Sequence, residues 1–182
     1  MLVIQNGLVH DAVHPEAYRA DIVIQDSRIL TVGDAGAPEK ADIFDASGMD
    51  VWPGLIDAHT HIGMFGYGGP LSKDDDELYS SVCPQHRGID AVNPNSVDFS
   101  YARRGGVTAV GVGPGSVESI GGTHFVMKTA GLRVDRMIVK NPSAMKVAFG
   151  ESPKGNSLDK KASRMTVASQ IRDALSAARE YR

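Results

Sequence analysis

Short apolar runs and turn-forming residues alternate along the first fifty residues. The apolar runs are Leu2–Ile4, Ile22–Ile24 and Ile29–Val32. Short strands separated in this way are typical of a small β-sandwich and not of a helical domain. Asn6-Gly7 predicts a tight turn after the first run, and Asp26-Ser27 predicts the turn of a hairpin that joins the second run to the third. The pattern therefore predicts a β-sandwich portion over residues 1–52.

From residue 53 onward, strand patterns alternate with helix patterns. The expected elements are a strand over 54–58, a helix that ends at Arg103-Arg104, a β-branched strand over 107–112, a buried strand over 144–150 and a helix over 164–182. Gly105-Gly106 follows the first helix, and glycine is a common helix stop. Strands that alternate with helices favour a parallel sheet. Residues 53–182 are therefore expected to form an α/β domain.

The composition is that of an ordinary globular protein. Of the 182 residues, 42% are hydrophobic and 23% are charged, and the formal net charge is −3. This charge gives no reason to expect nucleic acid or an anionic membrane as a partner. The N-terminus lacks the basic flank and apolar core of a signal peptide, and no apolar run approaches the roughly 20 residues of a membrane span. We therefore expect a cytoplasmic protein, in which the single Cys83 is a bystander thiol and not a nucleophile.

Two histidines follow the apolar run that begins at Gly54. In a strand, alternate residues point to the same side, so His59 and His61 are expected to stand side by side at the strand's end, with Asp57 one step deeper. Two neutral imidazoles placed in this way can bind one divalent cation. Two unrelated surface histidines would show the same spacing, but these two close a run that reads as buried. The pattern favours a metal site.

The stretch Pro53-Gly54-Leu55-Ile56-Asp57-Ala58-His59-Thr60-His61 resembles the first barrel strand of the amidohydrolase superfamily. Gly105-Gly106-Val107-Thr108 is similar to the start of the second strand. Gly121-Gly122 and the stretch from Ala144 to Lys154 narrow the resemblance to imidazolonepropionase-like members. The resemblance implies a composite β-sandwich over 1–52 and, over 53–182, the front part of a (β/α)8 TIM barrel.

This resemblance also implies an activity and a ligand set. The activity is metal-dependent hydrolysis of a C–N bond, in a small cyclic amide, amide or peptide-like substrate, through a metal-activated water. One or two divalent ions are expected, with zinc as the expected metal, held by His59, His61 and a third ligand. For that ligand we favour Glu151, because it follows the strand's end, with a carbamylated Lys146 as the alternative. By analogy alone, His124 and Lys128 are expected to contact the substrate.

Two further stretches surround this site in the sequence. Glycines are dense from Gly63 to Pro70, which predicts a loop after a barrel strand and not a phosphate-binding loop, because no Gly-Lys-Ser/Thr follows. The charge run Lys73–Glu77 predicts a solvated face, with an acidic metal site as the second interpretation.

The rest of the family's site is not identifiable in this chain. The later histidine pair and the general-base aspartate are absent, and the stretch after Pro53 is about half of the roughly 250 residues that such a barrel takes. We therefore expect little or no activity from this chain alone, and a homo-oligomer or a complex with the missing C-terminal half. The alternatives are a non-enzymatic remnant or binding module, and one subunit of a split hydrolase completed in trans. The sequence does not name the substrate.

Overall fold

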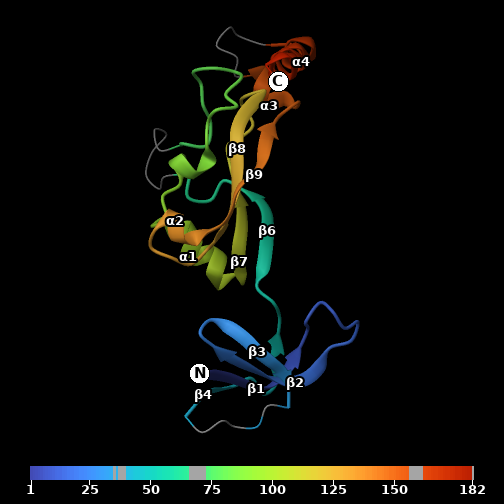
Figure 1. Ribbon diagram of the computed structural model, residues 1–182, viewed down its shortest axis with the longest axis vertical. Coiled ribbons are helices and arrows are strands. Elements are labelled where there is room, and N and C mark those ends of the chain that lie inside the picture. The colour runs from blue at the N-terminus through green and yellow to red at the C-terminus, as the bar shows by residue number, and fades with distance from the viewer. Residues whose placement is uncertain (35, 37–39, 66–72, 156–161, 182) are drawn as a thin grey trace. The chain divides into compact units, whose positions relative to one another are not determined.

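The computed structural model describes residues 1–34, 36, 40–65, 73–155 and 162–181. The chain separates into two compact units, Met1–Pro53 and Gly54–Arg182. The sequence pattern put the division between residues 52 and 53. Figure 1 shows both units.

The first unit is built on one five-stranded sheet. Its strands are β1 (Leu2–Val9), β2 (Tyr18–Gln25), β3 (Arg28–Gly33), β4 (Asp42–Asp45) and β5 (Asp50–Val51). The order is β3-β2-β1-β4, and β5 pairs with the second half of β1. Val9, Ala20 and Ile22 form its small buried core. The described residues thus supply one layer, and the second layer of the predicted sandwich is not found among them.

One predicted turn of this unit is confirmed and the other is wrong. β2 and β3 form the expected hairpin, with Asp26 and Ser27 at φ values of 50° and 63°. Both angles are those of the turn that matches the twist of a hairpin. Asn6-Gly7 instead lies inside β1, where the pairing with β2 shifts between Ile4 and Gly7. The side-chain amide of Asn6 donates a hydrogen bond to the carboxylate of Asp45 at 3.0 Å. Asn6 therefore stabilises a bulge in β1 through a tertiary contact and does not form a turn.

The second unit contains a four-stranded sheet in the order β6-β7-β8-β9. Its strands are β6 (Leu55–Thr60), β7 (Val107–Val112), β8 (Ile120–Lys128) and β9 (Ile138–Val147). Its helices are the 3-10 helix η1 (Gly88–Ala91), α1 (Val97–Arg104), α2 (Val134–Met137), α3 (Glu151–Gly155) and α4 (Arg164–Glu180). No helix among these described segments is long and apolar enough to cross a membrane.

The strand–helix–strand pattern at the start of this unit is confirmed. β6 and β7 pair in parallel, and α1 lies between them in the chain. The Ser96 side chain caps α1 by accepting from the backbone N–H of Asp98, and Gly105 ends the helix. A parallel pair brings the C-terminal ends of both strands to one edge of the sheet, where His59 lies near the end of β6 and His61 follows the strand.

The predicted strand over 144–150 is the end of β9, which stops at Val147 and pairs with an antiparallel strand instead of joining β7 in a parallel sheet. β8 is antiparallel to β7, and β9 is antiparallel to β8. The link from Val112 to Ile120 contains no helix, and a parallel return needs a longer crossover. β9 also runs through Asn141-Pro142, because it is an edge strand of the described sheet and its pairing is irregular there. Figure 1 shows the β8–β9 pair extending beyond β6 and β7, with α4 at its far end.

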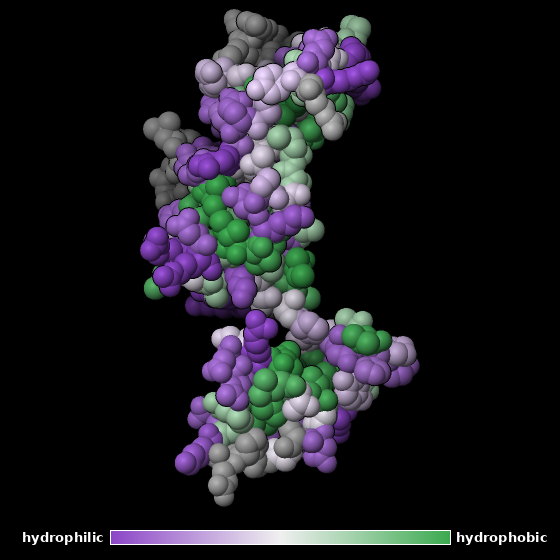
Figure 2. Space-filling view, viewed as in Figure 1, coloured by the Kyte–Doolittle hydropathy of each residue, from purple (hydrophilic) through white to green (hydrophobic). Residues whose placement is uncertain are grey.

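The core of this unit lies where α1 and α2 pack on β7 and β8. It consists of Met64, Val92, Phe99, Val110, Val112, Phe125, Met127 and Met137. A second cluster forms where α4 packs Val167 and Ile171 on Ile120. The predicted helix over 164–182 is confirmed for Arg164–Glu180, which form α4; Ser163 caps it by accepting from the backbone N–H of Thr166 at 3.4 Å. Hydrophobic residues also gather on the visible surface of each unit in Figure 2.

Candidate metal and substrate site

His59 and His61 converge at the C-terminal end of β6. Their ring centroids are 5.1 Å apart, with an interplanar angle of 84°. The carboxylate of Asp57 accepts from the backbone N–H of His59 at 3.1 Å, which holds the end of the strand in place. The structure therefore brings together the two imidazoles that the sequence pattern placed on one side of a strand.

The hydrogen bond made by His61 determines which nitrogen carries its proton. Nδ1 of His61 lies 2.7 Å from the carbonyl oxygen of Gly113, just beyond β7. A carbonyl only accepts, so Nδ1 is the donor and Nε2 keeps its lone pair. This is the arrangement that orients a histidine for metal binding through Nε2.

Lys146 reaches the same point from β9. Its Nζ lies 3.3 Å from Nε2 of His59. Burial lowers the pKa of Lys146, and the nearby charges of Asp76 and Glu118 oppose that shift. A lowered pKa increases the fraction of neutral amine, which is the form that reacts as a nucleophile.

His124 on β8 completes the cluster. Its ring stacks on His59 with centroids 5.0 Å apart and an angle of 22°. A Cβ on Gly113 would collide with the His124 ring, so glycine is needed at that position. Burial, followed by the charges of His59, Lys146 and His61, lowers the pKa of His124 to about 4. Burial is also the largest cause of the lowered pKa of His59.

Two of the predicted site residues lie elsewhere. Glu151 begins α3 and is exposed, and its carboxylate accepts from Nζ of Lys154 at 2.6 Å. Since β9 ends at Val147, Glu151 does not occupy the strand end on which its choice rested. Lys128 pairs with Ala109 in the first half of β7. It lies four residues from His124, or roughly 13 Å along a strand, so the structure does not bring it to the histidines.

A group of carboxylates lies beside the cluster; the sequence analysis gave an acidic site over Lys73–Glu77 only as a second interpretation and did not include Glu118. Asp75 is 6% exposed and Glu118 is 1% exposed. The buried atoms Asp75 Oδ1, Asp76 Oδ1 and Glu118 Oε2 have no hydrogen-bond partner among the described residues. Burial raises the pKa of Asp75 and of Glu118. The prediction of a solvated face over Lys73–Glu77 is therefore wrong for Asp75, because the chain folds this residue inward; no local pattern marks it.

These carboxylates line a cavity of about 700 Å³, within the usual size of ligand pockets. In the described ranges, no group of three or more His, Cys, Asp or Glu side chains is arranged to hold a metal ion.

Two other predicted features have no part in this geometry. Cys83 is fully buried, its thiol donates to the carbonyl oxygen of Ser80 at 3.4 Å, and burial raises its pKa. A buried thiol with a raised pKa is unreactive, so these contacts agree with Cys83 being a bystander. Most of the glycine-rich loop over Gly63–Pro70 lies outside the described residues.

Comparisons with known proteins identify the relatives of this chain. No family model matches it. Over its whole length the chain resembles the crystal structure of an amidohydrolase from Thermotoga maritima MSB8, with 32% sequence identity and a TM-score of 0.92, and it covers 48% of that chain. The amidohydrolase tasK of Hapsidospora irregularis is 33% identical over 129 residues, which are 64% of this chain and 13% of tasK. A D-hydantoinase of Geobacillus stearothermophilus is 41% identical over 75 residues, covering 41% of this chain and 15% of that enzyme.

Two of these three relatives are amidohydrolases by name and the third is a D-hydantoinase, and the structural resemblance to the Thermotoga maritima protein covers all of this chain. The chain is a member of the amidohydrolase superfamily. It spans less than half the length of each of these three relatives.

Proposed function

We propose that this chain contributes the front part of the active site of a metal-dependent amidohydrolase, which cleaves a C–N bond in a cyclic amide, amide or peptide-like substrate. The observation that carries the proposal is the convergence of His59, His61 and Lys146 at the end of β6. The hydantoinase among the relatives supports a cyclic amide as the substrate class. The segments at Gly121-Gly122 and from Ala144 to Lys154 support an imidazolonepropionase-like member in particular.

The donors present fit a divalent ion such as zinc. His61 has its Nε2 lone pair available, and burial favours the neutral form of His59, which is the form that coordinates. Lys146 would join them after carbamylation: its neutral Nζ adds to carbon dioxide, an N–C bond forms, and one proton leaves to solvent. The resulting carbamate is an anionic oxygen ligand. When bound, the ion supplies a Lewis acid that polarises the scissile carbonyl and acidifies a water molecule.

The other residues of the cluster orient these ligands. Gly113 fixes the tautomer of His61 through its carbonyl, and Asp57 anchors the backbone at His59. The ring of His124, whose lowered pKa favours its neutral form, stacks on the ring of His59. The remaining ligands and the general base would come from a segment beyond these residues, in the same polypeptide or in a partner.

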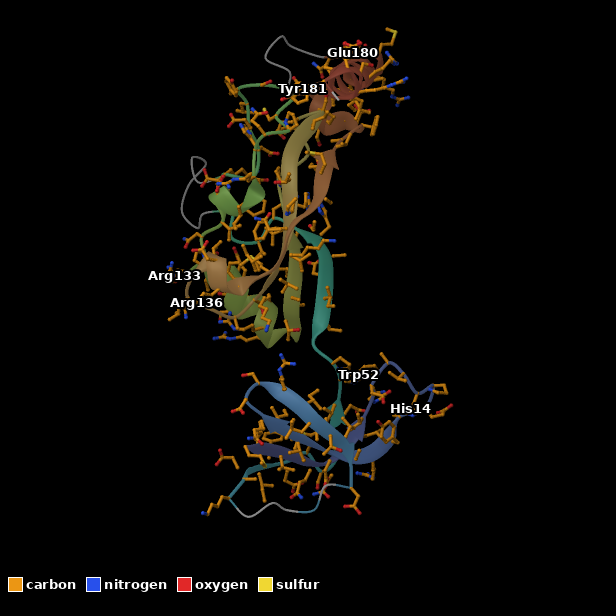
Figure 3. All side chains as sticks on the ribbon, viewed as in Figure 1. His14, Trp52, Arg133, Arg136, Glu180 and Tyr181 are labelled. Carbon is orange, nitrogen blue, oxygen red and sulfur yellow. The ribbon has the colours of Figure 1, made fainter. Side chains whose placement is uncertain are left out.

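Zinc titration by calorimetry tests this function. Replacing His61 removes a ligand, so His61→Ala should weaken zinc binding at least about 100-fold. His14→Ala is the matched control, because His14 is an exposed histidine of the first unit (Figure 3). Equal zinc affinity in the wild type and in His61→Ala would overturn the proposal and leave a metal-free binding module as the better account.

A further inference from the structure

We propose that Asp75, Asp76 and Glu118 form a subsite for a positively charged nitrogen group, such as a guanidinium or primary ammonium, on the substrate of this enzyme. The relevance of the subsite to a substrate rests on the proposed hydrolase function. The binding of a cation by these carboxylates does not depend on it.

The first argument is the lack of partners for buried acceptors. Glu118 is 1% exposed, and its Oε1 accepts from the backbone N–H of Glu77, while its Oε2 has no partner among the described residues. Asp75 is 6% exposed, and its Oδ1 likewise has no partner among the described residues. An unpaired buried carboxylate is costly, so a fold retains several of them together only where a donor completes them.

The second argument is that these oxygens lie around one cavity. A Cβ on Gly115 would lie 3.2 Å from Asp75 Oδ2 and would collide with Asp76 Oδ1. Glu118, Asp75 and Asp76 all line the cavity of about 700 Å³, which also has Gly121 in its wall. Carboxylates outnumber basic side chains in this wall, and Arg87 is already engaged by Asp90 at 2.8 and 2.9 Å. The cavity therefore has an excess of negative charge.

The third argument is the position of the cavity beside the metal ligands. A Cβ on Gly121 would lie 3.3 Å from Glu118 Oε2 and 3.4 Å from Lys146 Cγ. The Glu118 carboxylate and the Lys146 side chain therefore both lie next to Gly121, and Nζ of Lys146 lies 3.3 Å from Nε2 of His59. A substrate held near His59 would reach the carboxylates with a side group a few bonds away from the scissile amide.

The fourth argument concerns the kind of cation. Metal ions need oxygen ligands that converge to about 2.0–2.6 Å from one point. These carboxylates are not arranged in that way, since the described residues contain no group of three or more metal-binding side chains so placed. A guanidinium presents five N–H donors in a planar fork and spans separated carboxylates, with each donor about 2.8 Å from its acceptor.

Calorimetry with small probes tests this subsite in metal-free buffer containing EDTA. The probe is n-propylguanidinium, and n-propylurea is its neutral counterpart of nearly the same shape. We expect binding of the cation and at least 10-fold weaker binding of the urea. Glu118→Gln should weaken cation binding about 10-fold or more, because a charged acceptor is lost. Glu180→Gln, on exposed α4 (Figure 3), should leave it unchanged.

Further measurements keep the outcome decisive. Circular dichroism confirms that Glu118→Gln is folded, and Asp76→Asn supplies a second variant with the same expected loss. Equal binding of the two probes, or equal cation binding by both variants and wild type, would overturn the subsite. So would calcium binding that depends on Glu118 in EDTA-free buffer without any guanidinium binding. Because EDTA removes zinc, failure here leaves the zinc titration standing, and failure of the zinc titration leaves this result standing.

Discussion

The histidine cluster and the carboxylate group lie side by side and respond to burial in opposite ways. Burial lowers the pKa of His59 and of His124, and it raises the pKa of Asp75 and of Glu118. Each shift favours the neutral form. For an imidazole the neutral form is the metal ligand, so the fold prepares the histidines for use. For a carboxylate the charged form is the one that binds a cation, so a bound cation would offset the effect of burial on these groups.

The largest effect expected from this comparison is the pH dependence contributed by His124. Its pKa falls from 6.5 to about 4 on folding. Because the pKa of His124 is lower in the folded state, His124 stabilises the folded state fully above about pH 6.5. This stabilisation is lost as the pH falls toward 4. The shift corresponds to roughly 3 kcal/mol in the free energy of unfolding. Urea unfolding of the metal-free chain between pH 4 and 7 measures it.

His124→Gln should flatten this pH dependence, and His14→Gln should leave it unchanged. Part of the slope will persist in His124→Gln, because the pKa of His59 is lowered as well. If the free energy of unfolding depends on pH equally in both variants, the lowered pKa of His124 is contradicted.

The next effect concerns the close contact that holds His124 in place. A Cβ on Gly113 would collide with the His124 ring, so Gly113→Ala should destabilise the chain by about 1–3 kcal/mol, as overpacking does. Gly150→Ala is the control, since a Cβ there meets no atom within 4 Å. Thermal unfolding of both variants checks the difference, and equal melting temperatures would contradict the contact.

The carboxylate group should give an effect of the opposite sign. Because the pKa of Glu118 is raised in the folded state, Glu118 stabilises that state most at low pH. This stabilisation is lost as the pH rises from the unfolded pKa through the folded pKa. Glu118→Gln should therefore stabilise the metal-free chain by about 1–2 kcal/mol at pH 7 and by less at pH 4. Urea unfolding at both values, with Glu180→Gln alongside, measures this. If Glu118→Gln were less stable than the wild type at pH 7, burial would not disfavour the charged form of Glu118, and the contrast with the histidine cluster would be wrong.

The smallest effects are expected at the predicted residues that lie outside the cluster. Glu151→Ala and Lys128→Ala should change zinc affinity less than about 2-fold, because neither side chain contacts the histidines in the structure. Lys146→Ala should weaken zinc binding about 10-fold or more, through loss of the carbamate ligand. A larger loss in Glu151→Ala than in Lys146→Ala would restore Glu151 as the third ligand.

What the sequence could predict depended on how local each feature is. The Asp57–His61 stretch, the β2–β3 hairpin and α4 follow from short-range spacing, and the structure contains them. The position of the antiparallel strand β8 between β7 and β9 does not follow in this way, because it depends on the short link between Val112 and Ile120, which has no helix. The choice of Glu151 rested on a place directly after the strand, and this premise does not hold because β9 ends at Val147.

The carboxylate group shows a different limit. Asp75 belongs to a run of charges that normally faces solvent, and Glu118 stands alone in the sequence. They meet only because the link after β7 folds back over the segment around Asp75, where Gly115 donates its backbone N–H to the carbonyl of Asp75 at 2.6 Å. A contact between distant parts of the chain leaves no periodic trace in the sequence.

The X-ray absorption spectrum of the zinc-loaded chain at the zinc K edge tests the metal site most directly. The account predicts two imidazole nitrogens at about 2.0–2.1 Å from the ion, together with oxygen ligands. In His61→Ala the imidazole count should fall by one, and in His14→Ala it should stay at two. A shell made of oxygen alone, or a spectrum that His61→Ala leaves unchanged, would contradict the claim that His59 and His61 bind one metal ion.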